Sequence, residues 1–167
     1  MSQLISSHNK KILRKNENPV IKKCNCTKEP CPIEGKCQTE NVVYQATVQS
    51  ENNVETYVGL TSTTFKARWS NHKTAFKHVR HRNDTALAQH VWELKESNPN
   101  FDINKDITWK FIGRANPFSP ISGVCNLRTL EKWYILFKPN IATINKKEEI
   151  GNYCLHKKQR LLDKEKT

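Results

Sequence analysis

The sequence predicts a small α/β domain of the α+β type, in which a three-stranded antiparallel sheet is flanked by helices. Two alternating apolar runs, residues 42–48 and 54–60, surround the polar stretch 49–53 and so predict a β-hairpin. Pairing Val42 with Leu60 would place the apolar residues of both strands on one face of the sheet.

The segments after the hairpin predict three helices and one further strand. Residues 64–80 follow threonine and serine residues that can cap a helix, and they carry four apolar side chains at helical spacing: Phe65, Trp69, Phe76 and Val79. Residues 85–96 predict a second helix, residues 107–112 a third strand, and residues 122–137 a strongly apolar third helix. The predicted order of elements is therefore β-β-α-α-β-α.

Composition divides the chain into four regions. Residues 1–23 are rich in lysine and predict a linker or a basic helix, and residues 24–40 form a cysteine-rich module. The sheet domain spans residues 41–150, and residues 151–167 form a basic tail. A length of 167 residues suits one domain with a small appendage.

The charge of the chain indicates a polyanionic partner. Lysine and arginine outnumber the acidic residues by 28 to 16, which gives a formal net charge of +12. No apolar run approaches the roughly 20 residues of a membrane span, and no secretory signal precedes the cysteines. We therefore expect no membrane partner, and we expect reduced cysteines.

The cysteine-rich module has the spacing CxCx4Cx5C, formed by Cys24, Cys26, Cys31 and Cys37. Four thiolates within this reach can surround Zn²⁺, and metal binding would supply the folding free energy that so short a segment lacks. Free or redox-labile thiols and disulfides are the alternatives. Cys154 and His156 offer a further ligand pair, whereas Cys125 at the start of an apolar helix is expected in the core.

Basic residues are concentrated between residues 66 and 82, a stretch without any acidic residue. Five of them are expected to contact the phosphates of DNA: Lys66, Lys73, Lys77, Arg80 and Arg82. The alternative is a solvated helix face, although such faces usually mix charges of both signs.

Three residues of the predicted helices have an unusual placement. Arg68 and His72 lie four residues apart beside the aromatic stripe of the first helix, where a histidine can be a core residue or face a reacting phosphate. Glu131 lies inside the apolar stripe of the third helix, where a buried carboxylate requires a cation. That cation can be Arg128 or Lys132 on the same helix, or a hard metal ion such as Mg²⁺.

The predicted hairpin also carries two tyrosine motifs, Val42-Val43-Tyr44 and Tyr57-Val58-Gly59, and four polar residues follow in the order Arg68, His72, Glu131 and Asn145. This ordered set resembles the GIY-YIG endonuclease superfamily, although Val42-Val43 stands where the family has Gly-Ile.

Within that superfamily, the chain is most similar to the endonuclease region of Penelope-like retroelements, over nearly its whole length. The similar segments include Ser6-Ser7-His8-Asn9, Gly35-Lys36-Cys37, Asn83-Asp84-Thr85 and Cys154-Leu155-His156. Arg128 stands where the resemblance leads us to expect a second cysteine, which argues against a metal site around Cys125.

The resemblance implies a GIY-YIG-like fold and a metal-dependent DNA endonuclease. Glu131 would hold Mg²⁺ or Mn²⁺, Arg68 would neutralise charge on the phosphoryl oxygens, and Tyr44 would act as or orient the general base. Tyr57 and His72 would position the attacking water. Asn145 would fix groups around the metal. The nick would prime reverse transcription, with a reverse transcriptase domain or element RNA as partner and the nucleus as the expected location.

The expected hairpin register conflicts with this site, because it places Tyr44 and Tyr57 on opposite faces. A one-residue shift or a bulge would bring them together. Without one, Tyr44 is a core residue of the sheet. Two other functions also remain open. One is a zinc-stabilised nucleic-acid-binding module that does not cut. The other is a basic protein-interaction domain, which would show no salt-dependent DNA binding.

Overall fold

The computed structural model describes residues 2–17, 22–116, 124–147 and 150. Its elements are α1 (Ser2–Glu17), β1 (Val42–Gln49), β2 (Val54–Thr61), α2 (Phe65–Lys77), η1 (Val79–His81), α3 (Ala86–Ser97), β3 (Ile107–Arg114), α4 (Asn126–Phe137) and η2 (Pro139–Ile141). The order matches the predicted β-β-α-α-β-α, with α1 preceding it inside the lysine-rich region.

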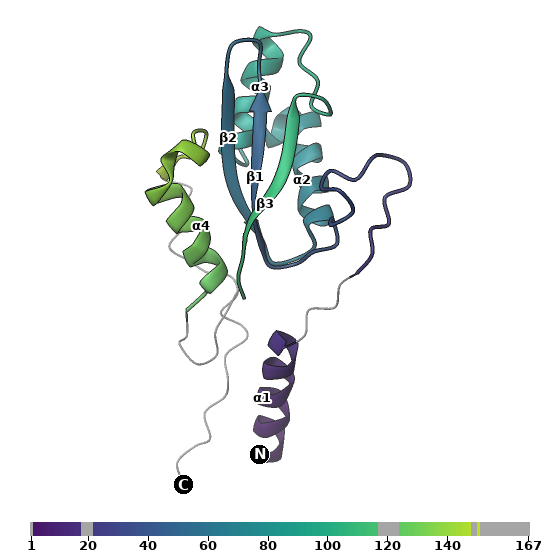
Figure 1. Ribbon diagram of the computed structural model, residues 1–167, viewed down its shortest axis with the longest axis vertical. Helices are drawn as coiled ribbons and strands as arrows, with labels where there is room; N and C mark the ends of the chain where they lie inside the picture. The colour runs from purple at the N-terminus through teal and green to yellow at the C-terminus, as the bar shows by residue number, and fades with distance from the viewer. Residues whose placement is uncertain (1, 18–21, 117–123, 148–149, 151–167) are drawn as a thin grey trace.

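The three strands form one antiparallel sheet in the order β2-β1-β3, which confirms the predicted α+β class with a three-stranded antiparallel sheet. Helices α2 and α3 cover one face and α4 covers the other, which buries β1 between two layers (Figure 1). The cysteine-rich loop lies beside α2, and α1 lies apart from the sheet (Figure 1). Within the described residues, none of the helices combines the length and the apolarity required to cross a bilayer.

The hairpin register differs by one residue from the predicted pairing. Val42 lies opposite Thr61, Tyr44 opposite Gly59, and Ala46 opposite Tyr57, which places both tyrosines on the face covered by α2. The prediction was wrong because it assumed a single buried face. In the structure, Val43 and Val58 are also fully buried, against α4, so apolar side chains occupy both faces.

A β-bulge interrupts the pairing of β1 with β3 beside Tyr44. Val43 lies opposite Gly113 and Tyr44 opposite Phe111, so Ile112 is the extra residue. The carbonyl of Ile112 accepts a hydrogen bond of 2.6 Å from the Tyr134 hydroxyl of α4. The bulge therefore fixes α4 to the sheet close to the tyrosine.

Two helix boundaries differ from those predicted. Helix α2 ends at Lys77 because His78 takes an extended backbone conformation, and Val79 in the following turn is 66% exposed rather than buried. Helix α4 begins at Asn126 rather than at residue 122, because Cys125 has an extended backbone conformation; residues 122 and 123 lie outside the described residues. Phe137, at the last turn of α4, is 69% exposed and does not belong to the core.

Candidate functional site

The hydroxyl of Tyr44 is the centre of the candidate site. It accepts a hydrogen bond of 2.9 Å from Arg68 Nε, and it lies 2.7 Å from His72 Nε2. Tyr44 comes from the central strand, whereas Arg68 and His72 come from successive turns of α2. The side chains are fully or largely buried, so the structure joins three of the residues that the sequence singled out.

Gly59 provides the space that this arrangement needs. A β-carbon at that position would lie 2.5 Å from the Tyr44 hydroxyl oxygen and 3.0 Å from Cε1 of Tyr57. Any side chain there would displace the two tyrosines. A glycine inside a strand commonly marks such a close approach. Tyr57 itself is buried, and its ring lies edge-on to that of His72, with 6.2 Å between the ring centroids.

His72 is a neutral imidazole in this environment. It is 2% exposed, and burial together with the charge of Arg68 lowers its pKa well below the usual 6.5. The ring packs against Trp109 of β3 at 5.4 Å and stacks on Phe76 at 5.9 Å between centroids. A neutral imidazole with its proton on Nδ1 can accept a hydrogen bond from the Tyr44 hydroxyl at Nε2.

Arg68 is positively charged, and three neighbouring side chains stabilise its charge. The negative potential of Tyr44 raises the pKa of the guanidinium, and this effect outweighs the opposing effect of burial. Tyr57 and Glu131 raise the pKa further, so the carboxylate of α4 acts on the arginine of α2. Glu131 is 8% exposed, and its Oε2 accepts a 2.8 Å hydrogen bond from Arg128 Nη1.

Asn145 contacts the edge of the sheet. Its amide oxygen accepts a hydrogen bond from Val58 N at 2.7 Å, and its amide nitrogen donates to Val58 O at 2.8 Å. Ile144 N also bonds Thr56 O at 2.9 Å, so residues 143–145 cover β2 as a further strand would. Both polar atoms of the Asn145 amide thus bind backbone, next to the strand that carries Tyr57 and Gly59.

The four cysteines of the N-terminal module converge on one point. Their sulfur atoms all lie within 4.8 Å of one another, with 3.7 Å between Cys26 and Cys37 and 3.5 Å between Cys24 and Cys37. A tetrahedral Zn–S site with bonds of about 2.3 Å has sulfur atoms about 3.8 Å apart. The residues therefore fit a metal such as Zn²⁺, as the spacing predicted.

Two thiols of this cluster, Cys31 and Cys37, differ strongly in pKa. Burial raises the pKa of Cys31, but backbone N–H groups of Ile33 and Gly35 and the neighbouring thiols bring it down to about 7. Burial and the surrounding sulfur atoms raise the pKa of Cys37 to about 12. A thiolate that accepts backbone N–H bonds next to protonated thiols is suited to exchange those protons for a metal ion.

The module also caps the helix that carries Arg68 and His72. The first two N–H groups of α2 donate to carbonyls of the module, Phe65 to Thr39 at 2.9 Å and Lys66 to Cys37 at 2.8 Å. The Lys66 ammonium adds a 2.7 Å bond to the Asn25 side chain. The cysteine cluster therefore fixes the start of α2, one turn before Arg68.

The basic residues predicted to bind DNA fall into two groups. Lys66 binds Asn25, Lys73 forms an ion pair with Glu29, and Arg82 forms a bidentate pair with Glu96 at 2.5 and 3.1 Å. Lys77 and Arg80 are exposed. The expected open row of lysines along α2 is therefore occupied in part by the cysteine-rich module, and its charge is partly neutralised.

Cys125 is buried at the start of α4 and packs with Val43, Val58 and Leu127, as expected of a core residue. Cys154 and His156 lie outside the described residues.

Three residues of the site were not assigned a role from the sequence. Gly59 carried a signal, since glycine is unusual inside a strand, and Arg128 was noted as an alternative partner of Glu131 and as a departure from an expected cysteine. Trp109 was predicted only as a strand residue, although its ring contacts Tyr44, Phe65 and His72. Only the packing of β3 against α2 reveals that contact.

Comparison of the chain with protein-family models, with curated proteins and with solved structures finds no match.

Proposed function

We propose that this protein is a metal-dependent DNA endonuclease that hydrolyses phosphodiester bonds. The observation that carries the proposal is the Tyr44 hydroxyl, which joins Arg68 and His72 in a buried cluster within electrostatic reach of Glu131. A guanidinium that lies within electrostatic range of a carboxylate can serve both charges of the reaction, because the guanidinium suits the phosphate and the carboxylate suits a metal cation.

Arg68 is the group that would contact the scissile phosphate. Its Nε is bound by Tyr44, and within the described residues its two terminal nitrogens make no hydrogen bond. These two donors suit phosphoryl oxygens, and the positive charge would stabilise the negative charge that develops there.

Tyr44 and His72 would act as positioning residues for this arginine. Tyr44 is 0% exposed and His72 is 2% exposed, so in this geometry neither side chain meets solvent directly. The Tyr44 oxygen accepts a hydrogen bond from Arg68 Nε, and its O–H can donate a hydrogen bond to Nε2 of neutral His72, which fixes the direction of the guanidinium. Tyr57 would support this orientation through its contact with His72.

Glu131 would hold the catalytic cation. Glu131 is a single buried carboxylate that acts electrostatically on Arg68, and one carboxylate can hold Mg²⁺ or Mn²⁺ when water and substrate oxygens complete the coordination. The cation, when bound, would polarise the scissile phosphate and stabilise the leaving oxygen. Arg128, which pairs with Glu131 in the structure, would orient the carboxylate.

A plasmid-nicking assay tests this function. Supercoiled DNA is incubated with zinc-loaded protein in Mg²⁺, in Mn²⁺, or without either ion, and Glu131→Gln is compared with Glu93→Gln. Glu93 is an exposed residue of α3, so it is a control for the loss of a negative charge. We expect Mg²⁺- or Mn²⁺-dependent nicking by wild type and Glu93→Gln, and none by Glu131→Gln. Because Glu131→Gln also removes the ion pair with Arg128, a cooperative thermal unfolding transition above the assay temperature must show that this variant is folded.

We extend this proposal on the basis of the sequence motifs that resemble those of Penelope-like endonucleases. The nick would supply a 3′ end for target-primed reverse transcription, in the nucleus, together with a reverse transcriptase domain or the element RNA. Wild-type protein that binds plasmid but leaves it intact under all of these conditions would refute the endonuclease proposal.

A zinc-stabilised nucleic-acid-binding module without cleavage activity is the second candidate. The convergent cysteines and the net charge of +12 favour it independently of Glu131. It predicts salt-dependent DNA binding that is the same for wild type and Glu131→Gln.

A further inference from the structure

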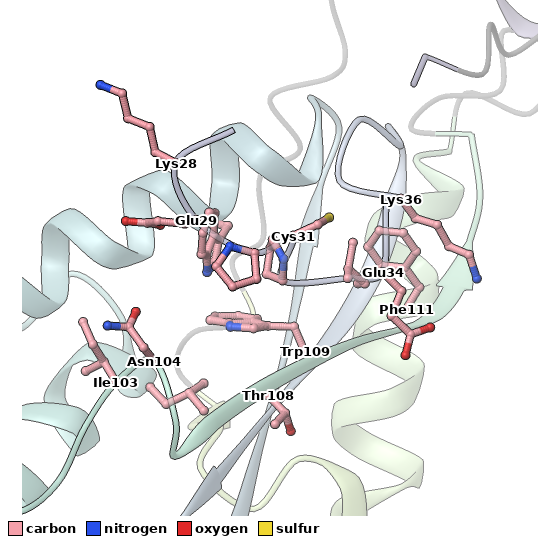
Figure 2. A pocket seen from close by; sticks show the side chains of 15 residues that line it. Lys28, Glu29, Cys31, Glu34, Lys36, Ile103, Asn104, Thr108, Trp109 and Phe111 are labelled. Carbon is pink, nitrogen blue, oxygen red and sulfur yellow. The ribbon is translucent and has the colours of Figure 1, made fainter. Parts of the chain in front are cut away.

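A groove of about 680 Å³ lies between the cysteine-rich module and the sheet, outside the cluster around Tyr44. One side is formed by the module between Lys28 and Lys36, and the other by the edge strand β3 with Trp109 and Phe111 (Figure 2). Trp69 of α2 also lines the groove. Its size is in the range of small-molecule sites in proteins, which span about 300–1,000 Å³.

Trp109 is the wall that the groove shares with the candidate catalytic cluster. Its ring lines the groove, and it also packs against Tyr44 at 5.8 Å and against His72 at 5.4 Å between centroids. Only the Trp109 ring would therefore separate a ligand in the groove from Tyr44 and His72, the residues that orient Arg68.

The floor and sides of the groove combine aromatic rings with polar groups. Trp69, Trp109 and Phe111 are partly exposed, and Asn104 and Thr108 add hydrogen-bonding side chains at the rim (Figure 2). Planar rings beside amide and hydroxyl groups suit a flat heterocycle that stacks and also forms hydrogen bonds.

The charges at the groove are arranged for a ligand with phosphates on both sides. Lys28 and Lys36 lie at its two ends, and both side chains are exposed (Figure 2). Glu29 is paired with Lys73, which offsets its charge, whereas Glu34 lies exposed near Lys36. Removal of the Glu34 charge should therefore strengthen the binding of a polyanion.

We propose that this groove binds an unpaired nucleobase of a DNA strand, with the flanking phosphates near Lys28 and Lys36. The proposal rests on the endonuclease function in that DNA is taken as the ligand. It implies that the enzyme prefers sites where one base is already unpaired or is easily drawn out of the duplex, because the cost of unstacking is then small.

Binding measurements without Mg²⁺ or Mn²⁺ test this proposal on zinc-loaded full-length protein. A single-stranded oligonucleotide of about ten nucleotides is compared with an abasic strand of the same length and charge, by fluorescence anisotropy. We expect the strand with bases to bind about tenfold more tightly, which is the scale of base–aromatic stacking. Trp69→Leu should remove that preference, whereas Trp133→Leu, on the exposed face of α4, should keep it.

A second measurement does not depend on a variant that folds. A 2-aminopurine placed within the strand should lose fluorescence on binding to wild type, because stacking quenches it, and Glu34→Gln should strengthen the binding of both strands. Equal affinity for the strand with bases and the abasic strand would overturn the groove proposal. Nicking in the plasmid assay would still stand in that case, so the two failures are distinguishable.

Discussion

Substitution of Gly59 by alanine tests the packing of the candidate site. The new methyl group would lie 2.5 Å from the Tyr44 hydroxyl oxygen and 2.6 Å from its Cζ. Tyr44 is fully buried, and Arg68 and His72 both bind its hydroxyl, so the ring has little freedom to move. We therefore expect Gly59→Ala to break at least one of these hydrogen bonds.

The size of the effect follows from three terms. Overpacking in a core costs about 1–3 kcal/mol, and each lost hydrogen bond costs about 0.5–1.5 kcal/mol. Replacement of glycine restricts the unfolded chain and returns about 0.4–1 kcal/mol. We expect a net loss of roughly 2–3 kcal/mol, or roughly 5–12 °C in melting temperature for a domain of this size.

Gly113→Ala is the matched control. Its methyl group would also be close to a neighbour, 2.7 Å from Cδ2 of Leu130, but that atom is the end of a flexible side chain. We expect a loss below about 1 kcal/mol there. Urea denaturation gives the stabilities and plasmid nicking gives the activities. If Gly59→Ala is as stable and as active as Gly113→Ala, the reasoning about Tyr44 is wrong.

Two further predictions concern the metal module and the buried histidine. Elemental analysis should find one zinc ion per wild-type protein, none in Cys37→Ser, and one in the core variant Cys125→Ser. Chelation of the zinc should lower the melting temperature of the wild type, because the module caps α2. His72 has a pKa below 6.5 in the folded state, so the unfolded chain takes up the proton first as the pH falls. The free energy of unfolding should therefore decrease below pH 6.5, by up to about 1.4 kcal/mol per pH unit, until the pH reaches the pKa of folded His72. Denaturation at several pH values should show a smaller dependence of this free energy on pH for His72→Gln. An equal dependence for the two proteins would contradict a neutral His72 in the folded state.

The fold class could be predicted from the sequence because the spacing of apolar residues identifies each strand and helix locally. The apolar runs of β1, β2 and β3 form strands and the helical stripes of α2, α3 and α4 form helices, as predicted, although β1 and β2 bury apolar residues on both faces rather than on one. The hairpin register was not predictable in the same way. A strand buried on both faces has apolar residues at odd and even positions, so alternation no longer selects one pairing.

The candidate site shows the same division between local and tertiary information. Arg68 and His72 were grouped correctly because helical spacing alone brings them together. The approach of Tyr57 to Tyr44 depends on the register. The wall formed by Trp109 depends on the pairing of β3 with β1, and the cap that residues 37 and 39 provide for α2 depends on the docking of a loop. Such contacts between distant segments leave no periodic pattern in the sequence.

The most direct test of the central claim is the rate of Mg²⁺-dependent nicking by Arg68→Ala compared with Arg80→Ala, at saturating protein. Arg80 is an exposed cation in η1, whereas Arg68 is bound by Tyr44 and acted on by Glu131. We expect Arg68→Ala to nick about 100- to 1,000-fold more slowly and Arg80→Ala to stay within a few-fold of wild type. Equal rates for the two variants would contradict a catalytic site built around Arg68.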